Sequence, residues 1–168
     1  MKETNISIIL LIFLGACSSK GSHRRAVATF YSEKYSEISG KMKFKETSDI
    51  LVVTLGIYGL KPTSLHGLHV HEVGKCEGPD YKSAGAHYNP YSHSHGGRGN
   101  LQRHIGDFGN LTTDGTGLAN HTIKIENWKK GDLEKLRGKA VILHAQRDDL
   151  ITQPTGDSGA RIACGIIK

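Results

Sequence analysis

Short runs of alternating apolar and polar residues recur along the chain, which is the pattern of β-strands with one buried face. Ile50-Leu51-Val52-Val53-Thr54-Leu55 is the clearest example, and Ile123-Lys124-Ile125 is another. With the turn residues between them, these runs predict strands at seven places: 24–31, 37–45, 48–58, 65–73, 115–124, 139–145 and 160–167. Only the region around 128–136 favours a short helix. The pattern therefore predicts an all-β protein.

The length of the chain predicts one domain, and the composition of its middle part predicts a long loop. The chain has 168 residues, which is typical of a single domain, and we expect that domain to occupy residues 24–168. Between Cys76 and Phe108 the sequence is dense in Gly, Pro, Ser and Asn without a lasting period. An unstructured stretch longer than about 15 residues in a compact domain is usually functional or disordered.

Two histidines mark the strand that precedes this loop. In Leu65-His66-Gly67-Leu68-His69-Val70-His71-Glu72, His69 and His71 are two residues apart, so their side chains lie on one face of a strand. Two imidazoles on one face can reach one metal ion. On its own, such a pair is more often a surface accident or a structural hydrogen-bonding pair.

Further metal-binding residue types follow in an order that supports a site for two ions. The complete set is His69, His71, His87, His95, His104, Asp107 and His144. Imidazole nitrogen suits copper and zinc, and three imidazoles with one carboxylate suit zinc. Ligation inside the loop would supply the order that missing core contacts cannot. His144, at the end of the apolar run 140–143, taken alone would more simply be a core histidine.

Six separated motifs resemble those of bacterial copper/zinc superoxide dismutases. They are LHGLHVHEVG at 65–74, SAGAHYNP at 83–90, HGG at 95–97, RHIGDFGN at 103–110, LHAQRDDL at 143–150 and GARIACGI at 159–166. The resemblance implies a Greek-key β-sandwich or barrel of about eight antiparallel strands, with long metal-binding and electrostatic loops. It implies dismutation of superoxide to oxygen and hydrogen peroxide, with copper alternating between Cu(II) and Cu(I).

The same resemblance assigns the ligands. Copper would be bound by His69, His71, His87 and His144, and zinc by His87, His95, His104 and Asp107. His87 would then serve both ions, which requires both ring nitrogens to be unprotonated. When its bond to copper opens, that ring can take up a proton, so it would also be catalytic.

Other matched residues carry supporting roles. Arg161 would lie beside the copper and orient a small anion with its guanidinium fork, and Asp148 would link His69 to His95. Thr155 matches a residue at the mouth of the substrate channel. Ile151 and Pro154 stand where a family member can carry charges, so the electrostatic loop departs from the pattern. The resemblance also pairs Cys76 with Cys164 in a disulfide.

The N-terminal sequence predicts export. An apolar stretch ends in Leu14-Gly15-Ala16-Cys17, which resembles a bacterial lipoprotein signal whose cysteine becomes the lipidated first residue. We expect residues 1–16 to be a signal peptide and 17–23 a lipidated tether. Ser18 resembles the signals of outer-membrane lipoproteins. The expected location is the periplasm or cell envelope, where a disulfide persists.

Charge and partners complete the expectations. The chain carries 22 basic and 16 acidic residues, and the resulting +6 attracts superoxide or anionic lipid. No interleaving of aromatic and basic residues indicates nucleic-acid binding. The sequence leaves monomer and homodimer open. The alternative function is a periplasmic copper-binding or storage protein without turnover, against which Arg161 argues, because storage has no use for an anion-orienting cation.

Overall fold

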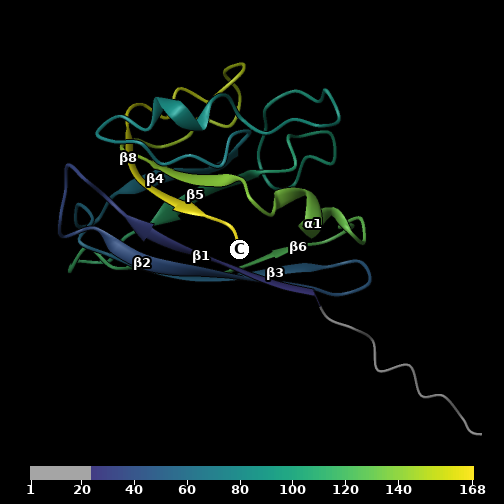
Figure 1. Ribbon diagram of the computed structural model, residues 1–168, viewed down its shortest axis with the longest axis horizontal. Helices are drawn as coiled ribbons and strands as arrows, with labels where there is room; N and C mark the ends of the chain where they lie inside the picture. The colour runs from purple at the N-terminus through teal and green to yellow at the C-terminus, as the bar shows by residue number, and fades with distance from the viewer. Residues whose placement is uncertain (1–23) are drawn as a thin grey trace, which may run out of the picture.

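The computed structural model describes residues 24–168, and the predicted signal peptide and tether, with Cys17, lie outside them (Figure 1). Eight antiparallel strands form one sheet in the order β5-β4-β7-β8-β1-β2-β3-β6. The strands are β1 Arg24–Tyr31, β2 Ser39–Glu46, β3 Leu51–Tyr58, β4 Leu65–His71, β5 Asp107–Thr112, β6 Ala119–Ile125, β7 Ala140–His144 and β8 Arg161–Ile166. The all-β prediction is confirmed, and the curled sheet is a nearly closed barrel, consistent with the expected Greek-key fold.

Two halves of the sheet enclose the core. β1, β2, β3 and β6 form the lower layer in Figure 1, whereas β4, β5, β7 and β8 form the upper one. Their inward residues are fully buried, for example Met42 and Phe44 on β2 and Leu68 and Val70 on β4. Phe44 meets Phe108 of the opposite layer edge to face, with ring centroids 6.0 Å apart. The alternating pattern in the sequence therefore reports which face of each strand lines this core.

The long segments that precede β5 and β8 gather on the upper side. Residues 72–106, with only the 3₁₀ turn η1 (Lys82–Ala84), and residues 145–160 lie there together in Figure 1. Helix α1 (Asp132–Leu136) is shorter than the predicted 128–136. No helix of the described residues is long and apolar enough to cross a bilayer.

One carboxylate holds the α1 region against the barrel. Glu46, at the end of β2, is only 1% exposed and accepts hydrogen bonds from the amides of Gly131 and Leu133 and from Trp128 Nε1. Arg24 Nη1 also donates to it at 2.9 Å. Burial by itself would raise the pKa of Glu46, but these hydrogen bonds outweigh it and lower the pKa.

Two predictions about strands were wrong. β5 was not predicted, because Asp107, Gly109 and Asn110 interrupt its apolar pattern and Gly109 has a positive φ of 66°. The strand expected at 115–124 begins only at Ala119. Asp114 Oδ1 accepts hydrogen bonds from the amides of Thr116 and Leu118, which fixes a turn there.

Candidate metal centre

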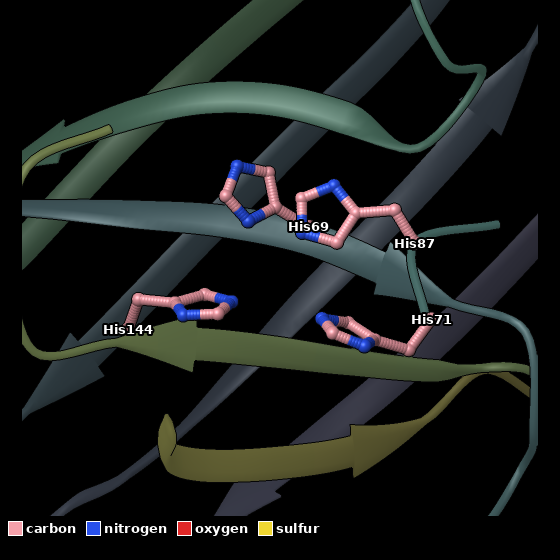
Figure 2. A group of neighbouring side chains, drawn as sticks. All are labelled: His69, His71, His87 and His144. Carbon is pink, nitrogen blue, oxygen red and sulfur yellow. The ribbon is translucent and has the colours of Figure 1, made fainter. Parts of the chain in front are cut away.

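The first ligand group is built from two neighbouring strands and one loop residue. His69 and His71 lie on β4, opposite Ile142 and Ala140 of β7, and His144 ends β7. His87 is held beside β4 by an isolated β-bridge to His71. One ligand atom from each of the four buried rings lies within 4.8 Å of the other three. Figure 2 shows the four rings converging on a common space.

The hydrogen bonds of His69, His71 and His144 leave one nitrogen of each ring free, and His87 has both nitrogens free. His71 Nδ1 donates to Gly85 O at 2.9 Å, and His144 Nδ1 donates to Gly159 O at 3.2 Å. His69 Nε2 donates to Asp148 at 2.7 Å. The remaining atoms, His69 Nδ1, His71 Nε2, His87 Nε2 and His144 Nε2, are buried without a partner among the described residues. Buried polar atoms are normally satisfied, so four orphaned nitrogens in one place fit a metal ion.

The second group surrounds Asp107, at the start of β5. Asp107 Oδ1 lies 3.3 Å from His87 Nδ1 and 3.3 Å from His104 Nδ1, and Oδ2 lies 3.0 Å from His95 Nδ1. The three Nδ1 atoms and Asp107 Oδ1 are again buried and unpartnered. Three imidazoles and one carboxylate form a donor set suited to zinc. His87 alone offers an unpartnered nitrogen to both groups.

Distance alone would put His69 rather than His104 with His87, His95 and Asp107. We favour His104, because both nitrogens of His69 are already committed: Nε2 faces Asp148 and Nδ1 faces the first group. His104 Nδ1 has no other partner.

Burial keeps three rings of the first group neutral. It lowers the pKa of His71 to about 2, of His144 to about 3 and of His87 to about 4. Burial also acts on His95, but the adjacent carboxylates of Asp107 and Asp148 outweigh it and raise its pKa to about 9. These three rings are therefore unprotonated at neutral pH, the form that binds metal.

Asp148 connects the two groups from behind. Its Oδ2 accepts from His69 Nε2 at 2.7 Å, and its Oδ1 accepts from His95 Nε2 at 2.9 Å. The carboxylate is fully buried, and the amide of Leu150 also donates to Oδ1 at 2.7 Å. These bonds orient both rings so that their Nδ1 atoms point into the two groups.

Arg161 stands at the start of β8, directly opposite His144 in the β7–β8 register. Its Nη1 donates to Tyr81 O and its Nη2 to Gly85 O, both at 2.7 Å. Gly85 O is also the acceptor for His71 Nδ1, so one carbonyl positions both the arginine and a ring of the first group. Arg161 is half-buried and forms no ion pair among the described residues. Its charge is therefore available to an anion.

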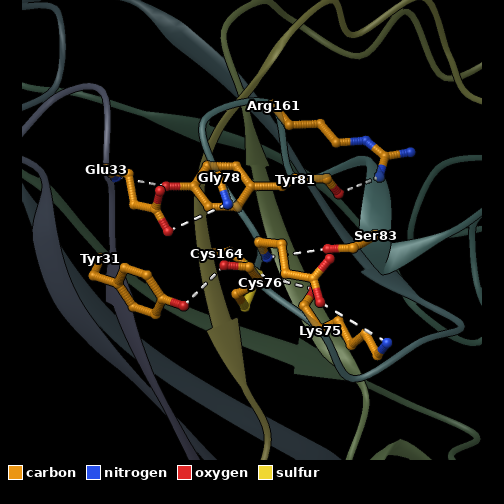
Figure 3. The surroundings of a disulfide bond; sticks show 10 residues. Tyr31, Glu33, Lys75, Cys76, Gly78, Tyr81, Ser83, Arg161 and Cys164 are labelled. Atoms are coloured by element: carbon orange, nitrogen blue, oxygen red, sulfur yellow. Dashed lines mark hydrogen bonds and ion pairs between the residues drawn. A yellow bond between two sulfur atoms is a disulfide. The ribbon is translucent and has the colours of Figure 1, made fainter.

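The disulfide between Cys76 and Cys164 is confirmed, and it joins the long loop to β8 with 5.7 Å between the Cα atoms. Figure 3 shows how the surrounding loop is held. Tyr31 Oη donates to Cys76 O at 3.0 Å, and Tyr81 Oη accepts from the amide of Glu33 at 2.7 Å. The loop carbonyls that hold Arg161 are thus anchored to β8 and to the end of β1.

The remaining residues of interest lie at the edges of the centre. Thr155 is exposed in the 145–160 segment, and its carbonyl oxygen accepts from Ser158 Oγ. Ile151 is 77% exposed in the same segment. His93, two residues before His95, turns away from both groups, because its Nδ1 bonds Arg103 O at 3.1 Å. His66 matches a structural histidine of the family that bonds backbone, and its Nδ1 does bond His144 O, which supports the end of β7.

Comparison with known proteins agrees with this centre. The family model for copper/zinc superoxide dismutase matches residues 38–167. The chain belongs to the copper/zinc superoxide dismutase family. "Superoxide dismutase [Cu-Zn] 1" of Aquifex aeolicus is 36% identical over 134 residues, covering 77% of this chain and 79% of the relative. "Extracellular superoxide dismutase [Cu-Zn]" of Schistosoma mansoni is 35% identical, covering 95% of this chain and 94% of the relative.

A solved structure shares the fold as well. The crystal structure of the clock protein EA4 superimposes with a TM-score of 0.75 at 33% identity, covering 85% of this chain and 92% of that one. Membership of the copper/zinc superoxide dismutase family makes the chain a superoxide dismutase with copper and zinc as cofactors. The storage alternative is set aside, since the family and its relatives are enzymes by name.

Proposed function

We propose that copper is held by His69, His71, His87 and His144, and zinc by His87, His95, His104 and Asp107. The observation that carries this assignment is the set of eight buried, unpartnered donor atoms, which divide into two groups sharing only His87. Copper supplies reversible one-electron chemistry when bound, whereas zinc keeps one oxidation state. The chain's own contribution is orientation and electrostatics.

His87 and Arg161 are the residues that act on the substrate. Neither nitrogen of His87 has a hydrogen-bond partner among the described residues, so Nε2 would hold copper and, when not bound to it, would be able to hold a proton for product formation. Arg161 presents a charged fork whose direction is fixed by Tyr81 O and Gly85 O, which suits a small anion such as superoxide. Thr155 is exposed in the segment that precedes Arg161, and it would border the approach to the site.

Metal analysis of single variants tests the ligand assignment. His87→Ala should lose both metals, because it removes a donor from each group. His144→Ala should impair copper and largely spare zinc, because His144 belongs to the first group only. Selective loss of zinc from the His144 variant would contradict the assignment.

The role of Arg161 is tested by superoxide consumption on fully metal-loaded protein. Arg161→Ala should lower kcat/KM by at least roughly tenfold, because a preorganised donor to the reacting anion is lost. Arg25→Ala, a matched loss of charge at an exposed position of β1, should leave the rate unchanged. An Arg161 variant that keeps both metals and its full rate would refute the role.

Export and anchoring are also part of the proposal. Cys17 would carry lipid after removal of residues 1–16, and residues 17–23 would tether the domain in the cell envelope, where it would remove superoxide. The support is the lipoprotein-like sequence that ends at Cys17. Incorporation of an alkyne-labelled fatty acid should occur in cells expressing the chain and disappear in Cys17→Ser. Labelling that persists in this variant would exclude Cys17 as the attachment point.

A further inference from the structure

One broad face of the barrel carries basic side chains and no acidic ones. It is formed by the outward-facing side chains of β1, β2, β3 and β6, which alternate with the buried ones in each strand. Five of these outward residues are cationic: Arg25, Lys41, Lys43, Lys45 and Lys124. None of the outward residues on these four strands is acidic, since Glu46 faces the core. We call these five residues the basic face.

The sheet register places the cations in two crossing lines. Lys41, Lys43 and Lys45 follow one another along β2, about 7 Å apart for residues i and i+2. Across the strands, Arg25 pairs with Lys45, Lys45 with Val52, and Val52 with Lys124. At about 4.8 Å between strands, this row spans roughly 14 Å. The charge is therefore spread over an area rather than along one track.

These cations have no ion-pair partner in the part of the chain that the structure describes. None of the five takes part in an ion pair among residues 24–168, whereas Arg24, which turns inward, pairs with Glu46. A hollow of about 560 Å³ lies on the same face, lined by Lys41, Lys43, Thr54 and Asn120 among others. Unpaired ammonium groups beside hydroxyl and amide groups suit the phosphate of a lipid headgroup.

We infer that the basic face docks onto the surface of a bilayer containing anionic phospholipid. Each lysine or arginine held close to an anionic bilayer adds to binding. Because the cations of the basic face are spread in two dimensions, they suit a bilayer better than a linear polyanion. The sequence between Cys17 and β1 has six residues, which reach about 20 Å at most, so an anchor there would keep this face near a membrane.

The position of the metal centre agrees with this orientation. Figure 1 shows β1, β2 and β3 at the bottom of the molecule and the segments that carry the site at the top. Docking through the basic face would leave Arg161 and the approach to the metals open to solvent. The docked enzyme should therefore remain active.

Vesicle binding tests the inference without any contribution from a lipid anchor. Residues 18–168 contain all eight strands and the whole described core, so this chain can be used unlipidated and metal-loaded. We expect it to sediment with phosphatidylcholine vesicles that contain phosphatidylglycerol and not with phosphatidylcholine alone. Each lysine is worth about fivefold in affinity, so Lys41→Gln/Lys43→Gln/Lys45→Gln should weaken binding on the order of 100-fold.

The matched control removes the same charge elsewhere. Lys61→Gln/Lys129→Gln/Lys130→Gln changes three exposed lysines outside the basic face and should weaken binding less than about threefold. Equal losses in both triple variants would overturn the inference in favour of net charge. Binding to heparin without binding to the anionic vesicles would overturn it in favour of a linear polyanion. Superoxide consumption should be the same for all three proteins, which separates this test from that of the catalytic site.

Discussion

Replacing Asp148 with asparagine removes one oxygen from the group that orients both metal-facing rings. The remaining carbonyl oxygen should stay at the Oδ1 position, because it must still accept from the Leu150 amide and from His95. The new NH₂ group then takes the Oδ2 position and faces His69 Nε2. Two donors would meet there if His69 kept its proton on Nε2.

His69 can avoid that clash only by moving its proton to Nδ1, the nitrogen that faces the first group. Copper binding to Nδ1 would then return the proton to Nε2, where it would face the NH₂ group of the asparagine without an acceptor. Burying that unsatisfied donor costs about 1–3 kcal/mol. Asp148→Asn should therefore lower copper affinity about tenfold to 100-fold, while zinc affinity changes much less.

Competition with chromophoric chelators measures both affinities on the same protein. Asp157→Asn is the matched control, because Asp157 lies exposed in the same segment, and its φ of 47° is one that asparagine accepts. The control should keep both affinities. A variant of Asp148 that loses zinc rather than copper, or that behaves like the control, would show that the tautomer argument is wrong.

Two further predictions concern the frame around the site. Glu46→Ala should lower the free energy of unfolding by about 3–5 kcal/mol in urea, against less than about 1 for the exposed Glu134→Ala. Because the folded pKa of Glu46 is lowered, its contribution to stability is present above about pH 4.5 and is lost as the pH falls through the folded pKa. The stability difference between Glu46→Ala and wild type should therefore shrink in acid. Gly106→Ala should lower zinc content, because a Cβ there would lie 2.5 Å from Val70 Cβ and push the segment off β4. Gly99→Ala is the control and should retain zinc, because nothing lies within 4 Å of a Cβ at that position. Equal zinc content in the two variants would be evidence against the packing argument.

The sequence predicted the strands that line the core and failed where the backbone is irregular. Strand 24–31 has the predicted bounds, because its inward positions alternate without interruption. β5 could not be found by the same rule, since its pairing with β4 shifts register between Gly67 and His69. A strand held by backbone pairing around such an irregularity leaves no period-two signal in its side chains.

The candidate ligands could be chosen from spacing, but their division between two groups could not. Spacing along β4 puts His69 and His71 on one face, whereas nothing local shows which nitrogen of each ring is free. That depends on partners distant in sequence, such as Asp148 for His69 and Gly85 for His71. Hydrogen bonds across separations of 79 and 14 residues are set by the fold.

The position of Arg161 is likewise set by partners distant in sequence, Tyr81 and Gly85. The two carbonyls differ in what else they hold, so substitutions near them should have different effects on the site. Gly85 O accepts from both His71 and Arg161, so a shift of this carbonyl would move a metal-facing ring and the anion-binding cation together. Tyr81 O, by contrast, accepts from Arg161 and from the amide of Ala84, and from no metal-facing ring. Substitutions that move the backbone at Tyr81 should therefore alter substrate orientation while the two ligand groups stay intact. The disulfide at Cys76 limits such movement, because it fixes the start of this loop to the strand that carries Arg161.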